Sequence, residues 1–497
     1  MIRKKMPVLK PKKIMKPVAL EKPKAAKPPE LTLPKPIRIG AAPQLLRGMK
    51  DILPVDASYW KTVRAKCEEL AEFFGYMPIE TPIMEPRDLF VRGVGKQTDI
   101  VEKEMYAFTD QGGETIALRP ENTAAIVRAY VGHGMVNMPQ PVKLSYFGPF
   151  FRHDRPQAGR YRQFHQAGFE VLGDDHPVVD AELISLAWAF FKDLGISVTI
   201  QLNTIGCVNC RGVYRNKLVE YYKTKRGALC VNCRERLTRS PLRLLDCKEP
   251  SCETLKANAP QMLNHLDEAC HQHFFKVVEY LDDLNLPYVM NPYIVRGLDY
   301  YNRTVFEIWP EAVAGGAAKL EESVVPSDVE AGEAVAAVSS VEKPEVAGSM
   351  PAQVSLGGGG RYDGLAELLG GRPTPAAGFA LGIERVILAM KERSAAPAEP
   401  RPTQVFVAQL GEAARRKALV LLHAMRSDLK VASALSKDGL KPQLEIANRL
   451  GARYTVIVGQ KEVIDGTAIV RDMEAGMQEV VPFEKVAVDL KRRFGIV

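Results

Sequence analysis

Apolar and polar positions follow two different patterns on either side of about residue 400. Before it, helical periodicity over residues 55–74 precedes short runs of strand character. These runs are 77–84, 105–109, 115–118, 142–151 and 164–172. Hairpin-like strands with helices between them predict an antiparallel sheet flanked by helices, in an α+β fold. After Pro402 the order becomes strand 404–409, helices 412–426 and 440–450, and strand 454–458, which predicts a separate α/β domain.

Three stretches of biased composition set the expected domain boundaries. Residues 1–40 are rich in Lys and Pro and contain no aromatic residue, so we expect a disordered basic tail. Residues 311–353 are rich in Ala, Val, Glu and Gly and separate two strand-like segments, which predicts a mobile loop inserted into a hairpin. A Pro- and Ala-rich linker is expected at 396–402. The remaining domains are then 41–395, with a cysteine-rich insertion at about 205–290, and 403–497.

The positive charge of the chain is concentrated in that tail. The 497 residues carry a formal net charge of +8, but residues 1–40 hold twelve Lys and Arg against only Glu21 and Glu30. The remainder is therefore slightly acidic, and nucleic-acid binding by the body must depend on local arginines. No apolar run approaches the roughly 18 residues of a membrane span, and no signal-peptide pattern is recognised. We expect a cytoplasmic protein without a membrane segment.

Two arginine-bearing segments point to polyanionic ligands. The run 152–164 contains Arg152 and Arg160 between two strand-like stretches, and the run 378–385 is Gly-rich and ends with Arg385 at a helix start. An arginine binds phosphate and carboxylate oxygens bidentately, and helix N-termini favour phosphate. We expect Arg152 to reach an α-phosphate and a carboxylate, and Arg385 to hold the far end of a triphosphate.

Further segments offer groups for a small polar ligand. Glu121 and Thr123 follow a strand at the start of a helix and could face an ammonium group, although such residues usually only cap the helix. Gln166 and Glu170 lie four positions apart on one strand and therefore face the same side. The run 295–307 adds an arginine and two tyrosines around a Gly turn. A carboxylate and a phenol on opposite sides would match the two nitrogens of an imidazole.

The cysteine spacing is typical of structural zinc. Two CxxC pairs are separated by nineteen residues, and reduced structural thiols are the alternative to a metal site. The predicted zinc ligands are Cys207, Cys210, Cys230 and Cys233. Cys247 and Cys252 form a further pair, whereas Cys67 and Cys270 are expected to be ordinary helix residues.

Together these motifs resemble those of class II aminoacyl-tRNA synthetases, and among them the bacterial-type histidyl-tRNA synthetases. The resemblance covers about 45–310 and 354–497. Residues 75–86 resemble motif 1, which builds the dimer interface of the class, and 152–164 and 378–385 resemble motifs 2 and 3. The runs 296–302 and 358–365 resemble those that mark histidine specificity in the family.

The resemblance implies a role for each candidate position. The implied catalytic residues are Arg152, Arg296 and Arg385. The implied histidine-binding residues are Glu121, Asn122, Thr123, Arg152, Gln166, Glu170, Arg296, Tyr300, Tyr301 and Tyr362. The implied ATP-binding residues are Arg152, Arg160, Glu384 and Arg385. Because the family usually has Gly where Asn122 stands, the pocket is expected to differ slightly in shape there.

The activity implied by the resemblance is that of a histidine–tRNA ligase. Such an enzyme activates L-histidine with ATP and Mg²⁺ and transfers it to the 3′ end of tRNA(His), and it is expected to be a homodimer. Basic residues of the insertion, such as Arg211, are expected either to meet the tRNA acceptor stem or to form a solvated face. A second reading is a histidine-sensing regulatory subunit of ATP phosphoribosyltransferase. Such subunits generally lack the C-terminal domain and the synthetase residues, which this chain retains. A sensor of uncharged tRNA would need a fused effector domain.

Overall fold

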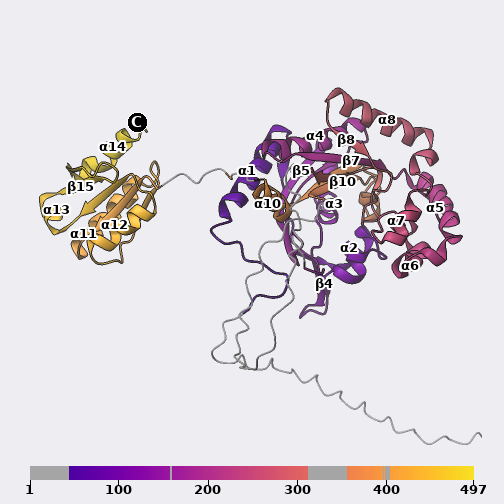
Figure 1. The fold of residues 1–497 in the computed structure, drawn as a ribbon, viewed down its shortest axis with the longest axis horizontal. Coiled ribbons are helices and arrows are strands. Elements are labelled where there is room, and N and C mark those ends of the chain that lie inside the picture. Colours follow the sequence, from indigo (N-terminus) through magenta and orange to yellow (C-terminus); the bar gives the residue numbers. More distant parts are fainter. Residues whose placement is uncertain are drawn as a thin grey trace, which may run out of the picture. The chain divides into compact units, whose positions relative to one another are not determined.

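The computed structural model describes residues 44–496 except 157–158, 312–354, 394, 396 and 398–402. The predicted tail, the predicted loop apart from Glu311, and most of the predicted linker lie outside the described residues. The described chain forms a larger part, which ends at residue 397, and a C-terminal part that begins at Thr403 (Figure 1).

An eight-stranded sheet forms the centre of the larger part, with strand order β1-β5-β6-β11-β10-β9-β7-β8. The strands are β1 Met77–Pro78, β5 Val142–Phe151, β6 Gln163–Leu172, β7 Val198–Thr204, β8 Tyr288–Met290, β9 Asn302–Pro310, β10 Gly357–Arg361 and β11 Ala376–Gly382. The inner strands pair in antiparallel fashion, and the edge strands β1 and β8 pair in parallel with their neighbours. The predicted α+β fold is confirmed. The antiparallel pairing of β9 with β10 also confirms the hairpin predicted on either side of the low-complexity segment.

One face of this sheet is apolar because alternate residues of its strands are large and hydrophobic. Phe169 of β6 lies opposite Phe379 of β11, and Leu202 of β7 lies opposite Phe306 of β9. These side chains belong to one buried cluster with residues of four helices. The helices are α1 Ala57–Phe73, α4 Pro177–Asp193, α8 Glu268–Asp283 and α10 Ile383–Glu392. Removal of this apolar face from water supplies the main core of the larger part.

The opposite face is rich in glycine, which leaves space above the sheet. Gln166 of β6 lies opposite Gly148 of β5 and Gly382 of β11, and Glu170 lies opposite Gly378 of β11. Directly paired residues of antiparallel strands project from the same side. A Cβ atom at Gly378 would lie 1.7 Å from the Glu170 Oε2 atom, so only glycine gives that carboxyl its room. We call this surface the glycine face.

Shorter elements surround the glycine face. They are α2 Arg87–Val94, the π-helix η1 Ile100–Glu104, α3 Thr123–Gly132, the 3₁₀ turn η2 Met135–Asn137, α9 Leu365–Leu368 and a three-stranded sheet of β2 Met84–Pro86, β4 Thr115–Leu118 and β3 Ala107–Thr109. Phe90 and Val94 of α2 pack against Ala124 and Ala125 of α3. This packing fixes the N-terminus of α3 above the sheet.

The segment between β7 and β8 is mostly helical and falls within the predicted insertion. Its elements are α5 Val208–Lys223, η3 Arg226–Ala228, α6 Val231–Arg239, η4 Pro241–Leu244, α7 Pro250–Lys256 and η5 Met262–His265, followed by α8. Figure 1 shows α5, α6 and α7 gathered at one end of the larger part. Tyr214, Leu218 and Tyr222 of α5 are buried with Leu237 of α6. Because β7 pairs with β8, the insertion leaves and rejoins the sheet at adjacent strands.

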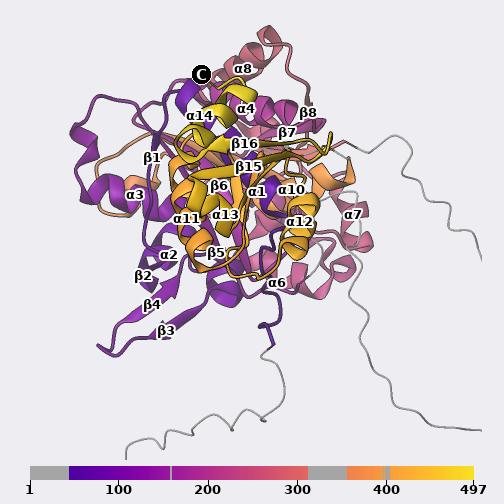
Figure 2. The same ribbon diagram turned by 90° about the vertical axis from the view of Figure 1, so that its left-hand side faces the viewer.

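The C-terminal part has its own five-stranded sheet, in the order β13-β12-β14-β15-β16. Figure 2 labels β15 and β16 together with the helices α11, α12, α13 and α14 of this part. Its elements are β12 Val405–Gln409, α11 Glu412–Met425, β13 Val431–Ser433, α12 Leu440–Arg449, β14 Tyr454–Val458, α13 Gln460–Asp465, β15 Thr467–Asp472, β16 Gln478–Pro482 and α14 Phe483–Arg493. Val405 and Val407 pack with α11 and α14, whereas Phe406 and Ala408 pack with α12. The predicted α/β domain is confirmed.

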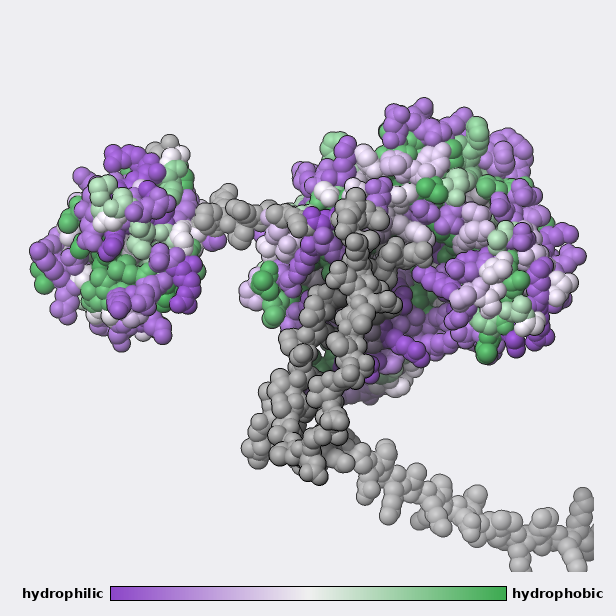
Figure 3. Space-filling view, viewed as in Figure 1, coloured by the Kyte–Doolittle hydropathy of each residue, from purple (hydrophilic) through white to green (hydrophobic). Residues whose placement is uncertain are grey.

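One predicted strand, 77–84, forms two separate elements. Met77 and Pro78 pair with the large sheet, and Met84 begins β2 of the small one. Pro78 and Pro82 lack N–H donors, so a continuous ladder through this stretch is excluded. Polar residues cover most of the face of the larger part seen in Figure 3, with apolar residues in small groups. Among the described helices, none has the length and apolar character needed to cross a membrane.

Candidate active site

A cavity of about 380 Å³ lies on the glycine face. Its wall contains Gln166 of β6, Gly358 of β10 and Ala380 of β11, together with the N-terminus of α3 and the start of α10. The predicted site residues that line it are Glu121, Thr123, Arg152, Arg160, Gln166, Arg296, Tyr300, Tyr301, Glu384 and Arg385. Residues from five separate chain segments thus meet at one cavity.

Arg152 and Arg385 place two guanidinium groups on the cavity wall. The Nε atom of Arg152 donates to the Pro120 carbonyl at 2.9 Å, and its guanidinium lies 5.3 Å from the centre of the Phe164 ring. Arg385 donates to the carbonyls of Gly159 and Ser355 at 3.1 and 2.7 Å. Burial, together with the charges of Arg160 and Arg152, lowers the pKa of Arg385 to about 10. Both side chains remain cations at neutral pH, and a bound anion would relieve their mutual repulsion.

Arg296 adds a third guanidinium from the loop before β9. Its NH1 atom donates to Glu307 Oε1 at 3.0 Å, and the group lies 5.5 Å from the centre of the Tyr301 ring. A Cβ atom at Gly358 would lie 2.8 Å from the same NH1 atom. The glycine of β10 is therefore needed for Arg296 to lie against the sheet.

Glu121 is a buried carboxylate at the N-terminus of α3. Its two oxygens accept hydrogen bonds from the backbone N–H groups of Thr123 and Ala124 at 2.8 and 3.1 Å, and the Tyr300 hydroxyl donates to it at 3.3 Å. Burial raises the pKa of Glu121 in spite of these bonds. The carboxylate thus both caps the helix and faces the cavity, so the capping role expected for this position does not exclude a ligand role.

Three predicted histidine-site residues lie just behind the cavity wall rather than on it. The Tyr362 hydroxyl donates to Glu170 Oε2 at 2.6 Å, and the Thr123 hydroxyl donates to Glu170 Oε1 at 2.8 Å. Burial raises the pKa of Glu170 to about 8. The Asn122 amide oxygen accepts from the Thr81 hydroxyl at 2.7 Å, so this side chain supports the start of α3.

The two remaining predicted ATP-site residues are already paired with protein groups. Arg160 forms an ion pair with Asp154 at 3.2 Å. Both Glu384 oxygens accept from the backbone N–H of His165 at 2.9 Å, and one also lies 2.9 Å from its Nδ1 atom. Glu384 therefore fixes the start of β6 against α10 at the edge of the cavity.

Several buried polar atoms at the cavity have no hydrogen-bond partner within the part of the chain that the structure describes. They are the Tyr146 hydroxyl, Gln166 Oε1, Arg243 Nε and Arg296 Nε. Buried polar groups are normally satisfied, and unpaired ones are costly. A polar ligand in the cavity would satisfy them.

Sequence reasoning missed several residues of the wall, including Tyr146, Glu104, Glu307 and Arg243. Tyr146 follows the alternation of β5 and could have been assigned to the site face from its register with β6. Arg243 comes from η4 of the insertion and forms ion pairs with Asp99 at 3.5 Å and Asp246 at 3.4 Å. No local motif marks it, because its place depends on how the insertion folds back onto the cavity.

The predicted four-cysteine ligand set is wrong as a single group. The structure separates the two CxxC pairs and gives each pair different partners. One group consists of Cys230, Cys233, Cys247 and Cys252, and the other of Cys207, Cys210, Asp267 and Cys270. Cys270 is therefore not an ordinary helix residue, whereas Cys67 lies buried in α1 as predicted. Spacing identifies CxxC pairs but not the loops that fold against them.

One predicted tRNA-facing residue is turned inward. Arg211 of α5 donates to the Tyr301 carbonyl at 2.6 Å and lies 3.4 Å from the Asp299 carbonyl. It is thereby a contact between the insertion and the tyrosine wall of the cavity. Arg215, one turn later, is exposed.

Comparison with known proteins gives consistent matches along the described chain. A family model described as "Histidyl-tRNA synthetase" matches residues 48–318, and one described as "Anticodon binding domain" matches residues 404–493. A histidine–tRNA ligase of Pelotomaculum thermopropionicum is 43% identical over 453 residues, which cover 90% of this chain and 97% of that protein. One of Desulforudis audaxviator is 44% identical over 448 residues, covering 90% and 98%. The crystal structure of apo histidyl-tRNA synthetase of S. aureus matches with a TM-score of 0.69 and 32% identity, over 90% of this chain and 100% of that one.

Proposed function

Because this chain belongs to the histidyl-tRNA synthetase family, it is an aminoacyl-tRNA ligase that joins histidine to tRNA, and we propose that its active site is the cavity on the glycine face. The observation that supports this location is the convergence of Arg152, Arg296 and Arg385 on one cavity. Three cations around one cavity are suited to a nucleoside triphosphate and a carboxylate.

In the first step an oxygen of the histidine carboxylate attacks the α-phosphorus of ATP, and the bond to the leaving pyrophosphate breaks. Arg152 and Arg296 would neutralise the charge that builds on the α-phosphate, and Arg385 would hold the departing phosphates. Mg²⁺, which accompanies ATP in such reactions, would offset further phosphate charge. In the second step a terminal ribose hydroxyl of the tRNA attacks the carbonyl carbon and AMP leaves. Catalysis comes from positioning and charge stabilisation, without a covalent enzyme intermediate.

Histidine would be read by groups at the base of the cavity. The Glu121 carboxylate, held at the start of α3, is placed to accept hydrogen bonds from the substrate ammonium group. Gln166 Oε1 and the Tyr146 hydroxyl are buried without a hydrogen-bond partner among the described residues, so they can bond the polar atoms of an imidazole. An amino acid of similar size without those atoms would leave these groups unsatisfied, which can discriminate by roughly 10⁴-fold or more.

The C-terminal part would bind the tRNA anticodon. Residues 404–493 match the anticodon-binding family model, and we assign 403–497 to this domain. The place of action would be the cytoplasm, where tRNA is charged.

The working form would be a homodimer that uses the motif 1 segment. Phe73, Met77 and Met84 have exposed fractions of 80%, 44% and 55%, and β1 lies at the edge of the sheet. Exposed apolar residues at a sheet edge mark an interaction surface. Sedimentation analysis should then give a species of twice 55.0 kDa.

The activity and its specificity are tested by ATP–pyrophosphate exchange with each of the twenty amino acids supplied singly. Exchange with histidine alone, followed by charging of tRNA(His), is the expected result. Histidine binding without exchange would instead support the regulatory-subunit reading. That reading is not favoured, because 43% identity to a histidine–tRNA ligase extends over 90% of the chain.

A further inference from the structure

The sulfur atoms of the insertion form two compact groups with the dimensions of metal sites. Within each group, all candidate ligand atoms lie within 4.8 Å of one another. Cys230 and Cys247 have Sγ atoms 3.9 Å apart, and Cys207 and Cys210 have Sγ atoms 3.5 Å apart. Tetrahedral zinc with Zn–S bonds of about 2.3 Å would hold its sulfurs about 3.8 Å apart. Disulfides require about 2.05 Å, and all of these cysteines are free thiols.

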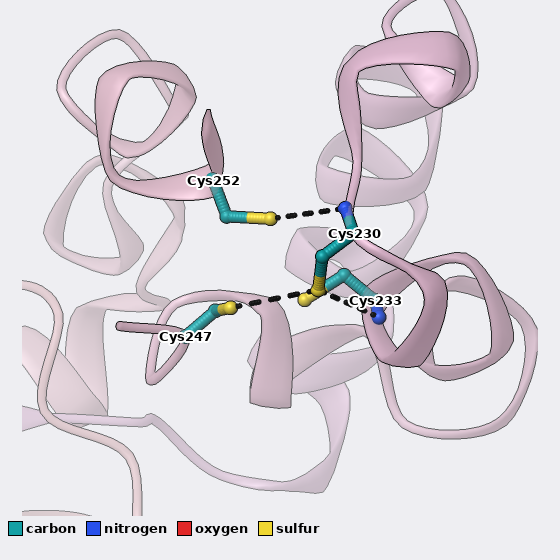
Figure 4. A group of neighbouring side chains, drawn as sticks. All are labelled: Cys230, Cys233, Cys247 and Cys252. Atoms are coloured by element: carbon teal, nitrogen blue, oxygen red, sulfur yellow. Dashed lines mark hydrogen bonds between the residues drawn. The ribbon is translucent and has the colours of Figure 1, made fainter. Parts of the chain in front are cut away.

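The first group contains four cysteines from three chain segments (Figure 4). Cys230 caps α6 and Cys233 lies in its first turn, whereas Cys247 and Cys252 come from the loop after η4 and from α7. The Cys230 N–H donates to Cys252 Sγ and the Cys233 N–H donates to Cys230 Sγ, both at 3.4 Å. Backbone donors and a helix N-terminus stabilise thiolates. Lys256, which donates to the Cys247 carbonyl at 3.2 Å, places a cation beside the group.

The second group joins the start of α5 to the start of α8. Cys207 and Cys210 form the CxxC pair, Asp267 caps α8, and Cys270 lies in the first turn of that helix. The Asp267 N–H donates to Cys210 Sγ at 3.1 Å. Asp267 Oδ1 accepts from the Cys270 N–H at 2.8 Å, and Oδ2 lies 3.2 Å from Cys207 Sγ. One carboxylate oxygen therefore caps the helix while the other is turned towards the sulfur atoms.

We propose that the insertion binds two structural zinc ions, one through Cys230, Cys233, Cys247 and Cys252 and one through Cys207, Cys210, Asp267 and Cys270. Four protein ligands close each site, which is the arrangement of structural rather than catalytic zinc. A carboxylate beside three thiolates suits zinc better than an iron–sulfur cluster, whose ligands are sulfur. This inference does not depend on the proposed function, because it concerns metal content.

The two sites would fix the part of the insertion that reaches the cavity. Arg211, bonded to the Tyr301 carbonyl, follows Cys210 directly in the chain. Arg243 lies between α6 and Cys247 and pairs with Asp99 at the cavity wall. Metal ligation would join α6 to α7 and α5 to α8, in addition to the buried cluster that contains Tyr214, Leu218 and Leu237.

Metal content of the full chain tests the proposal. The protein is purified without added metal or affinity tag, and zinc and iron are measured by mass spectrometry alongside a thiol count under non-reducing conditions. We expect two zinc ions per chain, slow reaction of the seven cluster thiols, and faster reaction once the protein is denatured with chelator. Fewer than one zinc ion per chain, or iron in its place, would overturn the assignment.

Single variants then assign the ligands. Cys252→Ser and Cys210→Ser should each lower the zinc content from two to one, and the double variant should lower it to none. Cys67→Ala, which removes a buried thiol outside both groups, should keep two. Cobalt(II) added to the metal-free chain supplies a readout where a variant folds poorly. Cobalt should give the intense sulfur-to-metal absorption of tetrahedral thiolate sites, stronger in Cys210→Ser, which keeps the four-thiolate site, than in Cys252→Ser. Equal spectra for the two variants would contradict the ligand sets.

Discussion

At the scale of single residues, burial decides the protonation of Glu170. This carboxyl lies beneath the cavity floor, where burial raises its pKa from 4.5 to about 8. The folded chain thus binds the proton more tightly than the unfolded chain. Its contribution to stability is full below about pH 4.5 and is lost as the pH rises towards 8, with a limiting slope of about 1.4 kcal/mol per pH unit.

Glu170→Gln removes this titration. We expect the melting temperature of the natural chain to fall relative to that of the variant between about pH 5 and pH 8, while the variant activates histidine poorly at every pH. Thermal unfolding followed by tryptophan fluorescence measures the difference, since Trp60, Trp188 and Trp309 all belong to the larger part. Glu253→Gln, at an exposed carboxylate on α7, is the matched control. Its melting temperature should change with pH in parallel with that of the natural chain. If the melting temperatures of Glu170→Gln and of the natural chain changed in parallel over this pH range, Glu170 would be ionised throughout it.

Gly378 is a second position at which a single atom matters. The Cβ of an alanine would lie 1.7 Å from Glu170 Oε2, so the carboxyl and its bond to Tyr362 must shift. We expect Gly378→Ala to lower kcat/KM for histidine in pyrophosphate exchange by about 100-fold, equivalent to about 2.7 kcal/mol. Gly132→Ala, where a Cβ atom meets nothing within 4 Å, is the control. A variant with unchanged histidine kinetics would contradict the role of Glu170.

At the scale of elements, a buried ion-pair network joins β10 to α4. Arg361 is fully buried and bonds to Asp180 of α4 at 3.1 Å and to Asp363 at 3.2 Å, and His273 of α8 lies 2.8 Å from Asp180. Removing one partner of a buried pair leaves the other charge uncompensated. We expect Arg361→Met to lower the free energy of unfolding by about 3 kcal/mol.

Urea denaturation followed by tryptophan fluorescence measures this change as a shift in midpoint. Lys217→Met, at an exposed lysine on α5, should change the same free energy by less than about 0.5 kcal/mol. Equal effects of the two variants would mean that the network contributes no more than a surface pair.

The two proposed zinc sites differ in exposure, and this difference predicts the order of metal release. Cys233, Cys247 and Cys252 are buried in the first site, whereas Asp267 of the second site is exposed. A chelator should therefore remove one zinc ion quickly and the other slowly, with the fast phase missing from Cys210→Ser. Release monitored with a coloured zinc indicator gives both rates. A single phase in the natural chain would contradict the difference between the sites.

The sequence pattern predicted those elements that pair regularly with neighbouring strands. β4, β5 and β14 have their predicted bounds: burial alternates along β5, whereas β14 ends in the continuous apolar run Val456–Val458. The strand predicted across Pro78 and Pro82 was wrong. The side-chain pattern favoured a strand there, but it does not register that both prolines lack an N–H donor. Motifs and family resemblance predicted ten residues of the cavity wall, whereas Arg243 and the partners of each CxxC pair were not predicted. These depend on contacts between distant segments, which neither spacing nor periodicity encodes.

At the scale of the whole molecule, the two parts have separate hydrophobic cores. The buried clusters of the larger part and those of residues 405–490 share no residue. We expect a chain that ends at residue 402 to fold and to retain histidine-dependent pyrophosphate exchange within about threefold, and to charge tRNA at least about 100-fold less efficiently, a loss of about 2.7 kcal/mol. Parallel assays of exchange and charging measure both. Loss of exchange from a folded truncated chain would show that the C-terminal part supports the chemistry itself.

The glycine face also limits how this protein can change under selection by an inhibitor. The wall of the cavity is bare backbone at Gly357, Gly358 and Gly382, so a compound that rests on it touches no side chain at those positions. Replacing Gly357 or Gly358 would place a Cβ atom against Arg296 or the backbone of a neighbouring strand. Resistance mutations at these glycines would thus also impair binding of the enzyme's own substrate. Inhibitors that contact the strands rather than the exposed rim would therefore allow few resistance mutations.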